Sequence, residues 1–165
     1  MPAGFLTRTA EPTDPLPVAV ADTSALIAFF NQADKHHNTA RAGIARVGHL
    51  VVSPCVLTEL DYLIATRQGP RTASAILAHV AGRVSMGRWE VPGIGSFLLA
   101  AHAVLDDYPA IGLADAMNVV LAREFRTDVI ATLDYRHFRA IRPLTPHSAF
   151  RLLPGDVPEV PDPGH

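Results

Sequence analysis

Apolar residues fall into two kinds of segment along this chain. Short, largely apolar runs occur at 17–22, 49–54, 128–134 and 150–154, and 88–93 is predicted to be a brief strand with a turn. Runs of this kind are typical of strands that are buried on both faces, as in a parallel sheet covered by helices. The sequence therefore predicts a mainly parallel sheet of four to five strands.

Longer segments with helical spacing of apolar positions separate these runs, at 24–32, 54–69, 70–85, 95–109 and 113–126, and 33–48 is predicted to hold a loop and a further helix. Pro54 and Pro70 stand where proline is favoured, in the first turn of a helix, and Gly69 and Pro109 mark helix ends. Strands that alternate with pairs of helices predict an α/β fold, with helices flanking a central sheet.

A chain of 165 residues is long enough for one domain with a sizeable core. We expect this domain at 16–154, between disordered proline-rich tails at 1–15 and 155–165. The single cysteine, Cys55, cannot form an internal disulfide, which suits the cytoplasm. We expect no membrane partner, because no apolar stretch reaches the roughly 18 residues of a membrane helix and no signal peptide is present.

The formal net charge of −2 is unevenly distributed. The two tails hold five acidic residues and one basic residue, whereas 16–154 holds 13 basic and 11 acidic residues. Thirteen of the fourteen basic residues are arginine, which suits bidentate phosphate contacts, although a GC-rich genome produces the same excess. The domain is therefore able to contact nucleic-acid phosphates without being generally basic.

Four acidic residues interrupt segments that we expect in the core, namely Asp22, Glu59, Asp115 and Asp134. Burying an isolated carboxylate costs several kcal/mol, so four such residues in one small domain indicate convergence on a shared cation. Two of them, Asp22 and Asp134, end predicted strands, and parallel strands bring their carboxyl ends to one edge of the sheet. Carboxylates gathered in this way most often bind Mg²⁺ or Mn²⁺.

Each carboxylate also has a simpler interpretation. Asp22 and Asp134 are able to cap the helix or turn that follows, and Glu59 to pair with an arginine inside the core. Asp115 is favoured by the positive end of its helix. The cation site would be unnecessary only if all four simpler interpretations were true at the same time. His36 and His37, adjacent on a predicted loop, are expected to be solvated.

The segments VAVADTSAL (18–26), VSPCVLTEL (52–60), LADAMNVVLA (113–122) and VIATLDYRHF (129–138) resemble those of PIN-domain proteins. The likeness is greatest to the VapC-type ribonuclease toxins of bacterial toxin–antitoxin pairs. It spans about 18–154, and the ATLDYRHF ending is its most specific part.

The resemblance implies a divalent-metal-dependent endoribonuclease that cleaves RNA with a metal-activated water. Matching position by position, Asp22, Glu59, Asp115 and Asp134 would form the acidic site. Mg²⁺ or Mn²⁺ would be held by Asp22 with Asp115 or Asp134, because Mg²⁺ takes only one or two direct carboxylates. Glu59 would act through a metal-bound water.

Three further residues are expected to support the site. Thr23 and Ser24 would hydrogen-bond near the metal. Asn118 lies three positions after Asp115, on the same face of the predicted helix, and is placed to hydrogen-bond in the site.

The resemblance also implies an RNA substrate, a cognate antitoxin protein that covers the site, and a homodimer. A PIN nuclease of RNA processing that is not a toxin, and a non-catalytic PIN-like module that binds RNA or protein, remain as alternatives. A receiver-like signalling domain is disfavoured, because no acidic residue closely precedes Asp22 and the only lysine, Lys35, comes far too early.

Overall fold

The structure is a computed structural model that describes residues 16–157. The predicted N-terminal tail, 1–15, lies outside the described residues, as does 158–165 of the C-terminal tail. Residues 155–157, at the start of the predicted C-terminal tail, are described. Asp156 accepts a hydrogen bond from the backbone N–H of Leu152 at 2.8 Å and forms an ion pair with Arg139.

Five parallel strands form the centre of the molecule, as the apolar runs predicted. The sheet order is β3-β2-β1-β4-β5. Every neighbouring pair of strands is parallel. The strands are β1 (Leu16–Ala21), β2 (Val47–Val52), β3 (Trp89–Glu90), β4 (Val129–Ala131) and β5 (Arg151–Leu153).

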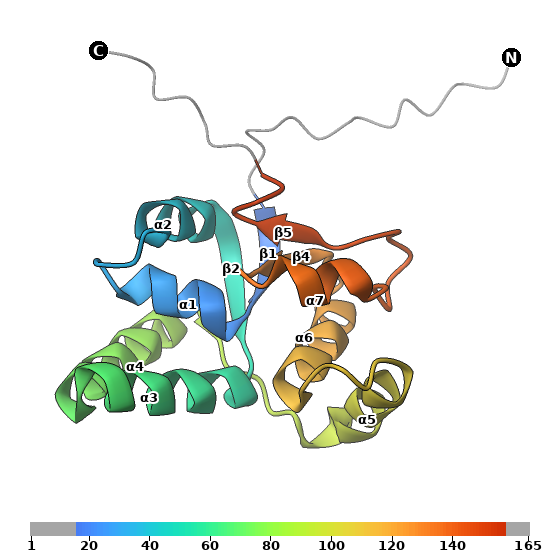
Figure 1. Cartoon of the computed structure of the whole chain (residues 1–165), viewed down its shortest axis with the longest axis horizontal. Coiled ribbons are helices and arrows are strands. Elements are labelled where there is room, and N and C mark those ends of the chain that lie inside the picture. Colours follow the sequence, from blue (N-terminus) through green and yellow to red (C-terminus); the bar gives the residue numbers. More distant parts are fainter. Residues whose placement is uncertain (1–15, 158–165) are drawn as a thin grey trace, which may run out of the picture.

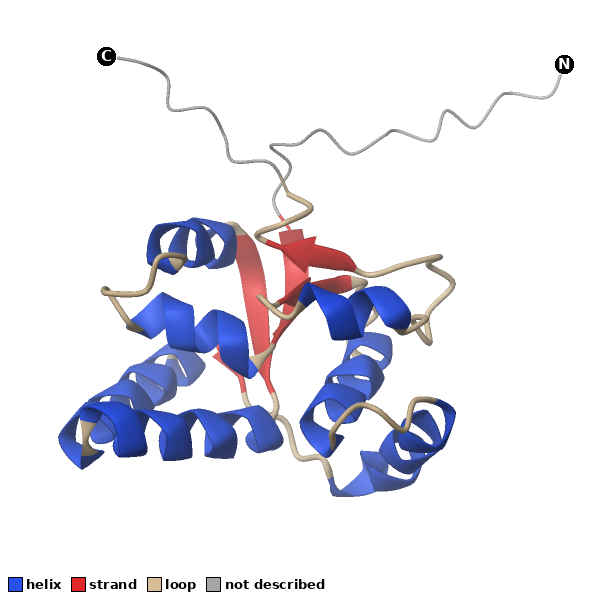
Figure 2. Ribbon diagram, viewed as in Figure 1, coloured by secondary structure: helices blue, strands red, loops and turns tan. Residues whose placement is uncertain are grey.

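Helices connect the strands and cover both faces of the sheet (Figures 1 and 2). They are α1 (Thr23–Phe30), α2 (His37–Ala45), α3 (Pro54–Gln68), α4 (Pro70–Ser85), α5 (Leu98–Asp107), α6 (Leu113–Glu124) and α7 (Tyr135–Ala140), with a short 3-10 turn η1 (Gly95–Phe97) before α5. Figure 1 shows α1 to α4 on one side of the sheet and α5 to α7 on the other.

The alternation of side chains along β1 explains the two layers. Ala19 and Ala21 pack into the cluster of buried residues formed with α1 to α4. Val20 belongs to a second buried cluster, formed with α5, α6 and α7. Because successive strand residues point to opposite faces, a strand covered on both sides must be apolar throughout.

Local chemistry sets the helix boundaries that matter for the site. Ser53 caps α3 by accepting a hydrogen bond from Cys55 N at 3.1 Å, and Pro54 follows in the first turn. Gly69 both ends α3 and starts α4, with a φ of 94° that a residue without Cβ adopts readily.

The predicted strand at 128–134 is too long. The strand β4 ends at Ala131, and the chain then bends so that Asp134 N donates to Thr132 Oγ1 at 2.9 Å. Short polar side chains compete in this way with the sheet for backbone groups. The helix α7, which the sequence did not reveal, follows at once, and Asp134 caps it by accepting from His137 N at 3.4 Å.

The two adjacent histidines differ in their surroundings. His36 is exposed, as expected, but His37 is buried, and its Nδ1 hydrogen-bonds to the carbonyl oxygen of Ala28 at 2.8 Å. The expectation of two solvated histidines is therefore wrong for His37, which ties α2 to α1.

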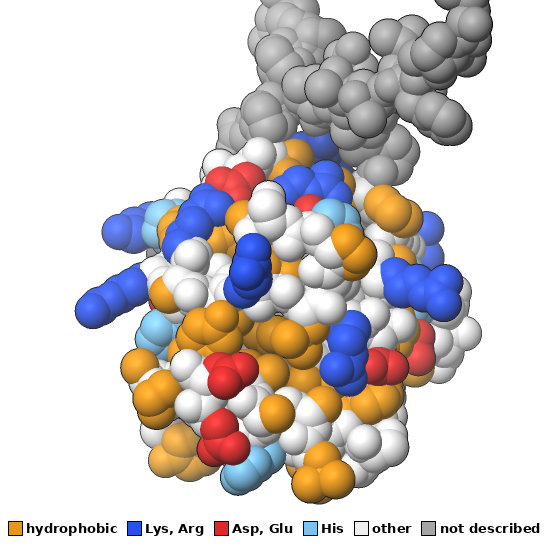
Figure 3. Space-filling view, turned by 90° about the vertical axis from the view of Figure 1, so that its right-hand side faces the viewer, with side chains coloured by type: hydrophobic (Ala, Val, Ile, Leu, Met, Phe, Trp, Pro, Cys, Tyr) orange, Lys and Arg blue, Asp and Glu red, His pale blue; other side chains and the backbone are white. Residues whose placement is uncertain are grey.

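The outer face over α5 and α7 has a distinct surface. Figure 3 shows a band of hydrophobic side chains across its middle, with several basic side chains above the band and acidic ones both above and below it. Leu98 and Leu99 of α5 are 49% and 86% exposed. No helix within residues 16–157 has both the length and the hydrophobicity that crossing a bilayer requires.

Candidate active site

The carboxyl ends of β1 and β4 bring the first two acidic residues together. Ala21 and Ala131 are partners in the parallel ladder, and the backbone N–H of Asp22 donates to the Ala131 carbonyl at 2.8 Å. Asp22 follows β1 directly, and Asp134 follows β4 after a two-residue bend. Both residues therefore lie at the edge of the sheet where ligands bind in α/β folds.

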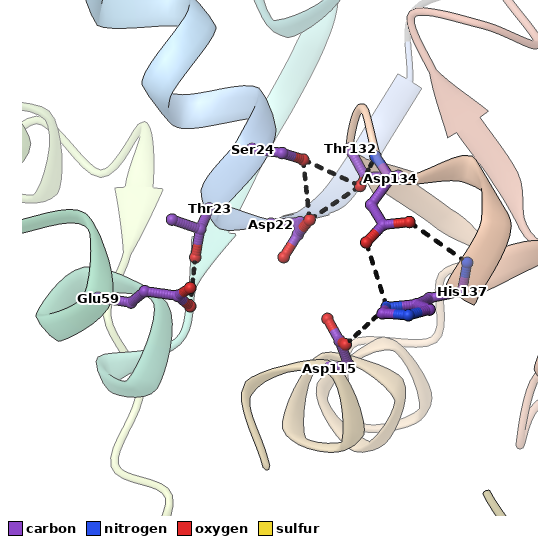
Figure 4. A network of polar contacts seen from close by, with 8 residues as sticks. All are labelled: Asp22, Thr23, Ser24, Glu59, Asp115, Thr132, Asp134 and His137. Carbon is purple, nitrogen blue, oxygen red and sulfur yellow. Dashed lines mark hydrogen bonds and ion pairs between the residues drawn. The ribbon is translucent and has the colours of Figure 1, made fainter. Parts of the chain in front are cut away.

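Hydroxyl groups fix the carboxylate of Asp22 (Figure 4). Ser24 and Thr132 each donate to its Oδ2 at 2.9 Å. Asp22 occupies the N-cap position of α1, yet its side chain makes no capping hydrogen bond. A role in capping the helix therefore does not account for this residue.

Burial raises the pKa of Asp22 above its ordinary value, and this effect outweighs the hydrogen bonds that favour the charged form. Only 7% of the residue is exposed. The negative charge of Asp134 adds to the upward shift. A carboxylate held in such a place is stabilised by a bound cation.

Thr132 is the polar residue that our sequence reasoning missed. Its hydroxyl donates to Asp22, lies 3.2 Å from Ser24 Oγ and accepts the backbone N–H of Asp134 at 2.9 Å. Ser24 Oγ in turn accepts from Leu133 N at 2.9 Å. The sequence shows only a hydroxyl residue at the end of an apolar run. The fold shows that Thr132 is fully buried and which groups it contacts.

Asp115 and Asp134 meet through a histidine. Nδ1 of His137 lies 3.2 Å from Asp115 Oδ2 and 3.1 Å from Asp134 Oδ2. Burial, followed by the negative charge of Asp22, raises the pKa of Asp115, while His137 lowers it. His137 therefore lies between two carboxylates of the site.

Glu59 reaches the site from α3, but it is exposed rather than buried. The sequence predicted an inward face because its neighbours are apolar, and Val56 and Leu60 are indeed buried. Glu59 lies at the border of this buried stripe. It accepts a hydrogen bond from Thr23 Oγ1 at 2.9 Å, in place of the core arginine of the simpler interpretation.

A single cavity of about 370 Å³ joins these groups. Its polar lining consists of Asp22, Thr23, Ser24, Glu59, Asp115, Asp134 and His137. The structure therefore brings together all four predicted acidic residues and two of the three predicted supporting residues. Of the four acidic residues only Asp22 is buried, so the expectation that all four lie in the core is wrong.

Comparison with known proteins agrees with this geometry. A family model of the PIN domain matches residues 19–142. The chain belongs to the PIN-domain family. It is 44% identical over 129 residues to ribonuclease VapC26 of Mycobacterium tuberculosis, covering 76% of this chain and 93% of that protein. It is therefore a VapC-type ribonuclease toxin.

A solved structure shares the fold of this PIN domain. The crystal structure of Mycobacterium tuberculosis VapC20, a toxin that cleaves the sarcin–ricin loop, superposes with a TM-score of 0.62. The superposed region covers 72% of this chain and 91% of the VapC20 chain, and the two sequences are 22% identical.

Asn118 is the predicted supporting residue that the PIN-domain cavity does not contain. It is fully buried in α6, and within residues 16–157 neither its Oδ1 nor its Nδ2 has a hydrogen-bond partner. Burying an unpaired amide costs about 1–3 kcal/mol.

The residues of this PIN domain suit a hard divalent cation. Within residues 16–157 no three His, Cys, Asp or Glu side chains already lie in a geometry that could hold a metal ion. Mg²⁺ does not require such a cage, because it takes one or two carboxylates and keeps several waters. From the described part of the chain, the cavity offers carboxylate oxygens, one histidine and no cysteine, a donor set that favours Mg²⁺ or Mn²⁺ over Zn²⁺.

Proposed function

We propose that this VapC-type ribonuclease cleaves RNA phosphodiester bonds by hydrolysis at the acidic cavity, with Mg²⁺ or Mn²⁺ held by Asp22 together with Asp115 or Asp134. The observation that carries the proposal is the convergence of these carboxylates, from three separate segments, on one cavity at the edge of the sheet. A bound divalent cation would supply stabilisation of phosphoryl charge and a lowered pKa for a bound water.

The chain's own groups have distinct roles in this proposal. Ser24 and Thr132 hold Asp22 in one orientation, so that one carboxylate oxygen is fixed before substrate arrives. Thr23 does the same for Glu59, which would orient the attacking water or take its proton. His137 holds a position between Asp115 and Asp134. We keep the supporting role of Asn118 as a prediction.

Hydrolysis, rather than attack by the RNA 2′-hydroxyl, suits the groups present. Attack by the 2′-hydroxyl calls for a general base and a general acid, commonly a pair of histidine or lysine side chains. Among the residues that the structure describes, one histidine and no lysine line the cavity. We therefore expect products with a 5′-phosphate.

Toxin function implies partners for this surface. We propose a cognate antitoxin protein that covers the cavity, a homodimer, and a cytoplasmic location that suits the single cysteine. Exposed apolar side chains such as Tyr62, at 67%, and Leu99, at 86%, support burial of part of the surface in an assembly. The non-catalytic alternative is disfavoured, because such a module has no need to keep four acidic residues around one cavity.

Metal dependence is tested by incubating purified protein with cellular RNA in EDTA, Mg²⁺ or Mn²⁺ and mapping the 5′ ends. We expect cleavage only with metal. The variants Asp22→Asn and Asp115→Asn should lower it by more than the roughly 10–100-fold that loss of an outer partner of a ligand costs. Cleavage by Asp22→Asn at the wild-type rate would refute the assignment.

Glu59→Gln has a matched control in Asp61→Asn, which removes an exposed charge from the same helix outside the cavity. A fall in cleavage for the first variant alone supports the role of Glu59.

Metal binding has an independent readout, because a ligand at 100 times its Kd stabilises the folded state by about 2.7 kcal/mol. Melting temperatures of wild type, but not of Asp22→Asn, should rise with Mn²⁺ concentration.

Toxicity separates the toxin from a nuclease of RNA processing. Induced expression of the wild type should arrest growth, and expression of Asp22→Asn should not. Normal growth during wild-type expression, with RNA cleavage intact in vitro, would favour the processing alternative.

A further inference from the structure

A second, smaller cavity lies away from the acidic site and is lined by arginines. Its volume is about 140 Å³, and three guanidinium-bearing residues surround it: Arg41 of α2, Arg83 of α4, and Arg88 in the turn before β3. Phe29 at the end of α1 and Trp89 complete an apolar part of the wall. In Figure 1, α2 and α4 lie on opposite sides of α1.

Among residues 16–157, no acidic side chain lines this cavity. Within residues 16–157 no salt bridge joins Arg41, Arg83 or Arg88 to a carboxylate; Arg83 Nε instead donates to His79 Nε2 at 3.4 Å. By contrast, Arg123, Arg139 and Arg151 form ion pairs with Glu124, Asp156 and Asp128. Three like charges around one small hollow repel one another, so the arrangement favours an anion.

The dimensions and the lining select the kind of anion. A volume of about 140 Å³ accommodates a phosphate group but not a whole nucleotide, since ligand pockets are typically 300–1,000 Å³. Guanidinium groups bind phosphate oxygens with paired hydrogen bonds, and three of them match the several oxygens of a phosphate. Arg41 and Arg88 are exposed and Arg83 is half-buried, so their guanidinium groups are accessible to an anion from solvent.

The position of the cavity relative to the acidic site suggests the source of the phosphate. Val47, in the cavity wall, pairs with Leu16 at the start of β1, whereas Asp22 follows the end of that strand. Six residues of strand span about 20 Å at roughly 3.3 Å per residue. Phosphates follow one another every 3.4 Å along one strand of a duplex, so this distance corresponds to about six stacked nucleotides.

We propose that the cavity formed by Arg41, Arg83 and Arg88 binds a backbone phosphate of the RNA substrate, about six nucleotides from the bond that is cleaved. The proposal rests on the proposed ribonuclease function and adds a second contact that recognises substrate length. A substrate too short to reach the arginines is then cleaved without their help.

The first test measures binding, so it does not depend on catalysis. Wild type, Arg41→Gln/Arg88→Gln and the control Arg67→Gln, which removes an exposed arginine from α3, are titrated with RNA of about twenty nucleotides in EDTA at several salt concentrations. We expect the double variant to bind roughly tenfold more weakly, with the slope of log K against log salt smaller by about 0.7–0.9. The control should match wild type.

The second test compares cleavage of RNAs of about four and about twenty nucleotides. The double variant should cleave the longer RNA about tenfold more slowly in kcat/KM and the shorter RNA at the wild-type rate. Equal losses on both lengths, or no loss on either, would overturn the proposal. So would unchanged RNA affinity with loss of binding to an acidic peptide, which would assign the cavity to a protein partner.

The two hypotheses fail separately. Loss of binding in the double variant without any cleavage by wild type would retain the phosphate site and reject the nuclease. Metal-dependent cleavage by wild type, together with unchanged RNA affinity of the double variant, would retain the nuclease and reject the phosphate site. Thermal melts check the fold, and Arg41→Lys/Arg88→Lys, which keeps the charges but not the paired hydrogen bonds, should bind with intermediate affinity.

Discussion

Thr132 Oγ1 donates a hydrogen bond of 2.9 Å to Oδ2 of Asp22, linking the ends of two neighbouring strands that are 110 positions apart in the chain. The same hydroxyl accepts the backbone N–H of Asp134. One threonine therefore fixes the orientation of one acidic residue and the path of the chain to another.

Replacing Thr132 by valine should lower RNA cleavage and metal affinity roughly 10–100-fold, because Asp22 loses a partner that holds its carboxylate. Thr132→Ser keeps the hydroxyl and should retain most of the activity. Cleavage rates measured over a range of Mn²⁺ concentrations test this expectation. Equal activity of the valine and serine variants would show that the hydroxyl has no part in the reaction.

The raised pKa of Asp22 predicts a pH-dependent effect of Asp22→Asn on stability in EDTA. Because folding favours the protonated carboxyl group, its stabilising contribution is complete below the unfolded value near 3.8 and is lost as pH rises through the higher folded pKa. We expect Asp22→Asn to be more stable than wild type at pH 7, and the difference to shrink in acid.

Urea unfolding at a series of pH values measures this difference. A less stable Asp22→Asn variant at pH 7 would contradict the assigned direction of the pKa shift. Asp22→Asn also removes the negative charge that helps to raise the pKa of Asp115, which adds to the greater stability expected of the variant at pH 7.

The unpaired amide of Asn118 predicts that Asn118→Leu is at least as stable as wild type, because the variant removes a buried polar group that costs about 1–3 kcal/mol. Denaturant unfolding measures the change. A loss of more than about 1 kcal/mol would show that the amide has a partner. Lower cleavage without lower stability would support its predicted role in the site.

Arg151 and Asp128 form an ion pair that stabilises the edge of the sheet at a place remote from the acidic cavity. Nε and Nη2 of Arg151 donate to the two carboxylate oxygens of Asp128, both at 2.8 Å. Burial alone would raise the pKa of Asp128, but the hydrogen bonds and charge of Arg151 lower it. Arg151→Met should cost about 1–3 kcal/mol at pH 7, because the buried carboxylate of Asp128 then keeps only His147, at 3.9 Å, as an ion-pair partner.

The contribution of Asp128 to stability is present above its unfolded pKa near 3.8 and is lost as pH falls through the lower folded value. The gap between wild type and Arg151→Met should therefore close in acid. Cleavage per folded molecule should be unchanged, since neither residue lines the acidic cavity. A gap that persists at low pH would assign the loss to packing of the arginine stem.

The sequence by itself determined the strands, the parallel sheet and the meeting of Asp22 with Asp134, because apolar periodicity and strand direction are properties of consecutive residues. It did not determine that Glu59 is exposed, that His37 is buried, or that Thr132 holds Asp22. Nor did it reveal α7, whose six residues are too few for a helical period to be recognised.

These features depend on which distant segments pack together. Thr132 and Asp22, or Arg41 and Arg88, become neighbours only when parallel strands and their connecting helices are in place. The exposure of a residue beside an apolar stripe is likewise set by its neighbouring helices. Tertiary structure alone decided these contacts, because a side chain's partners are fixed by packing in space and leave no local pattern in the chain.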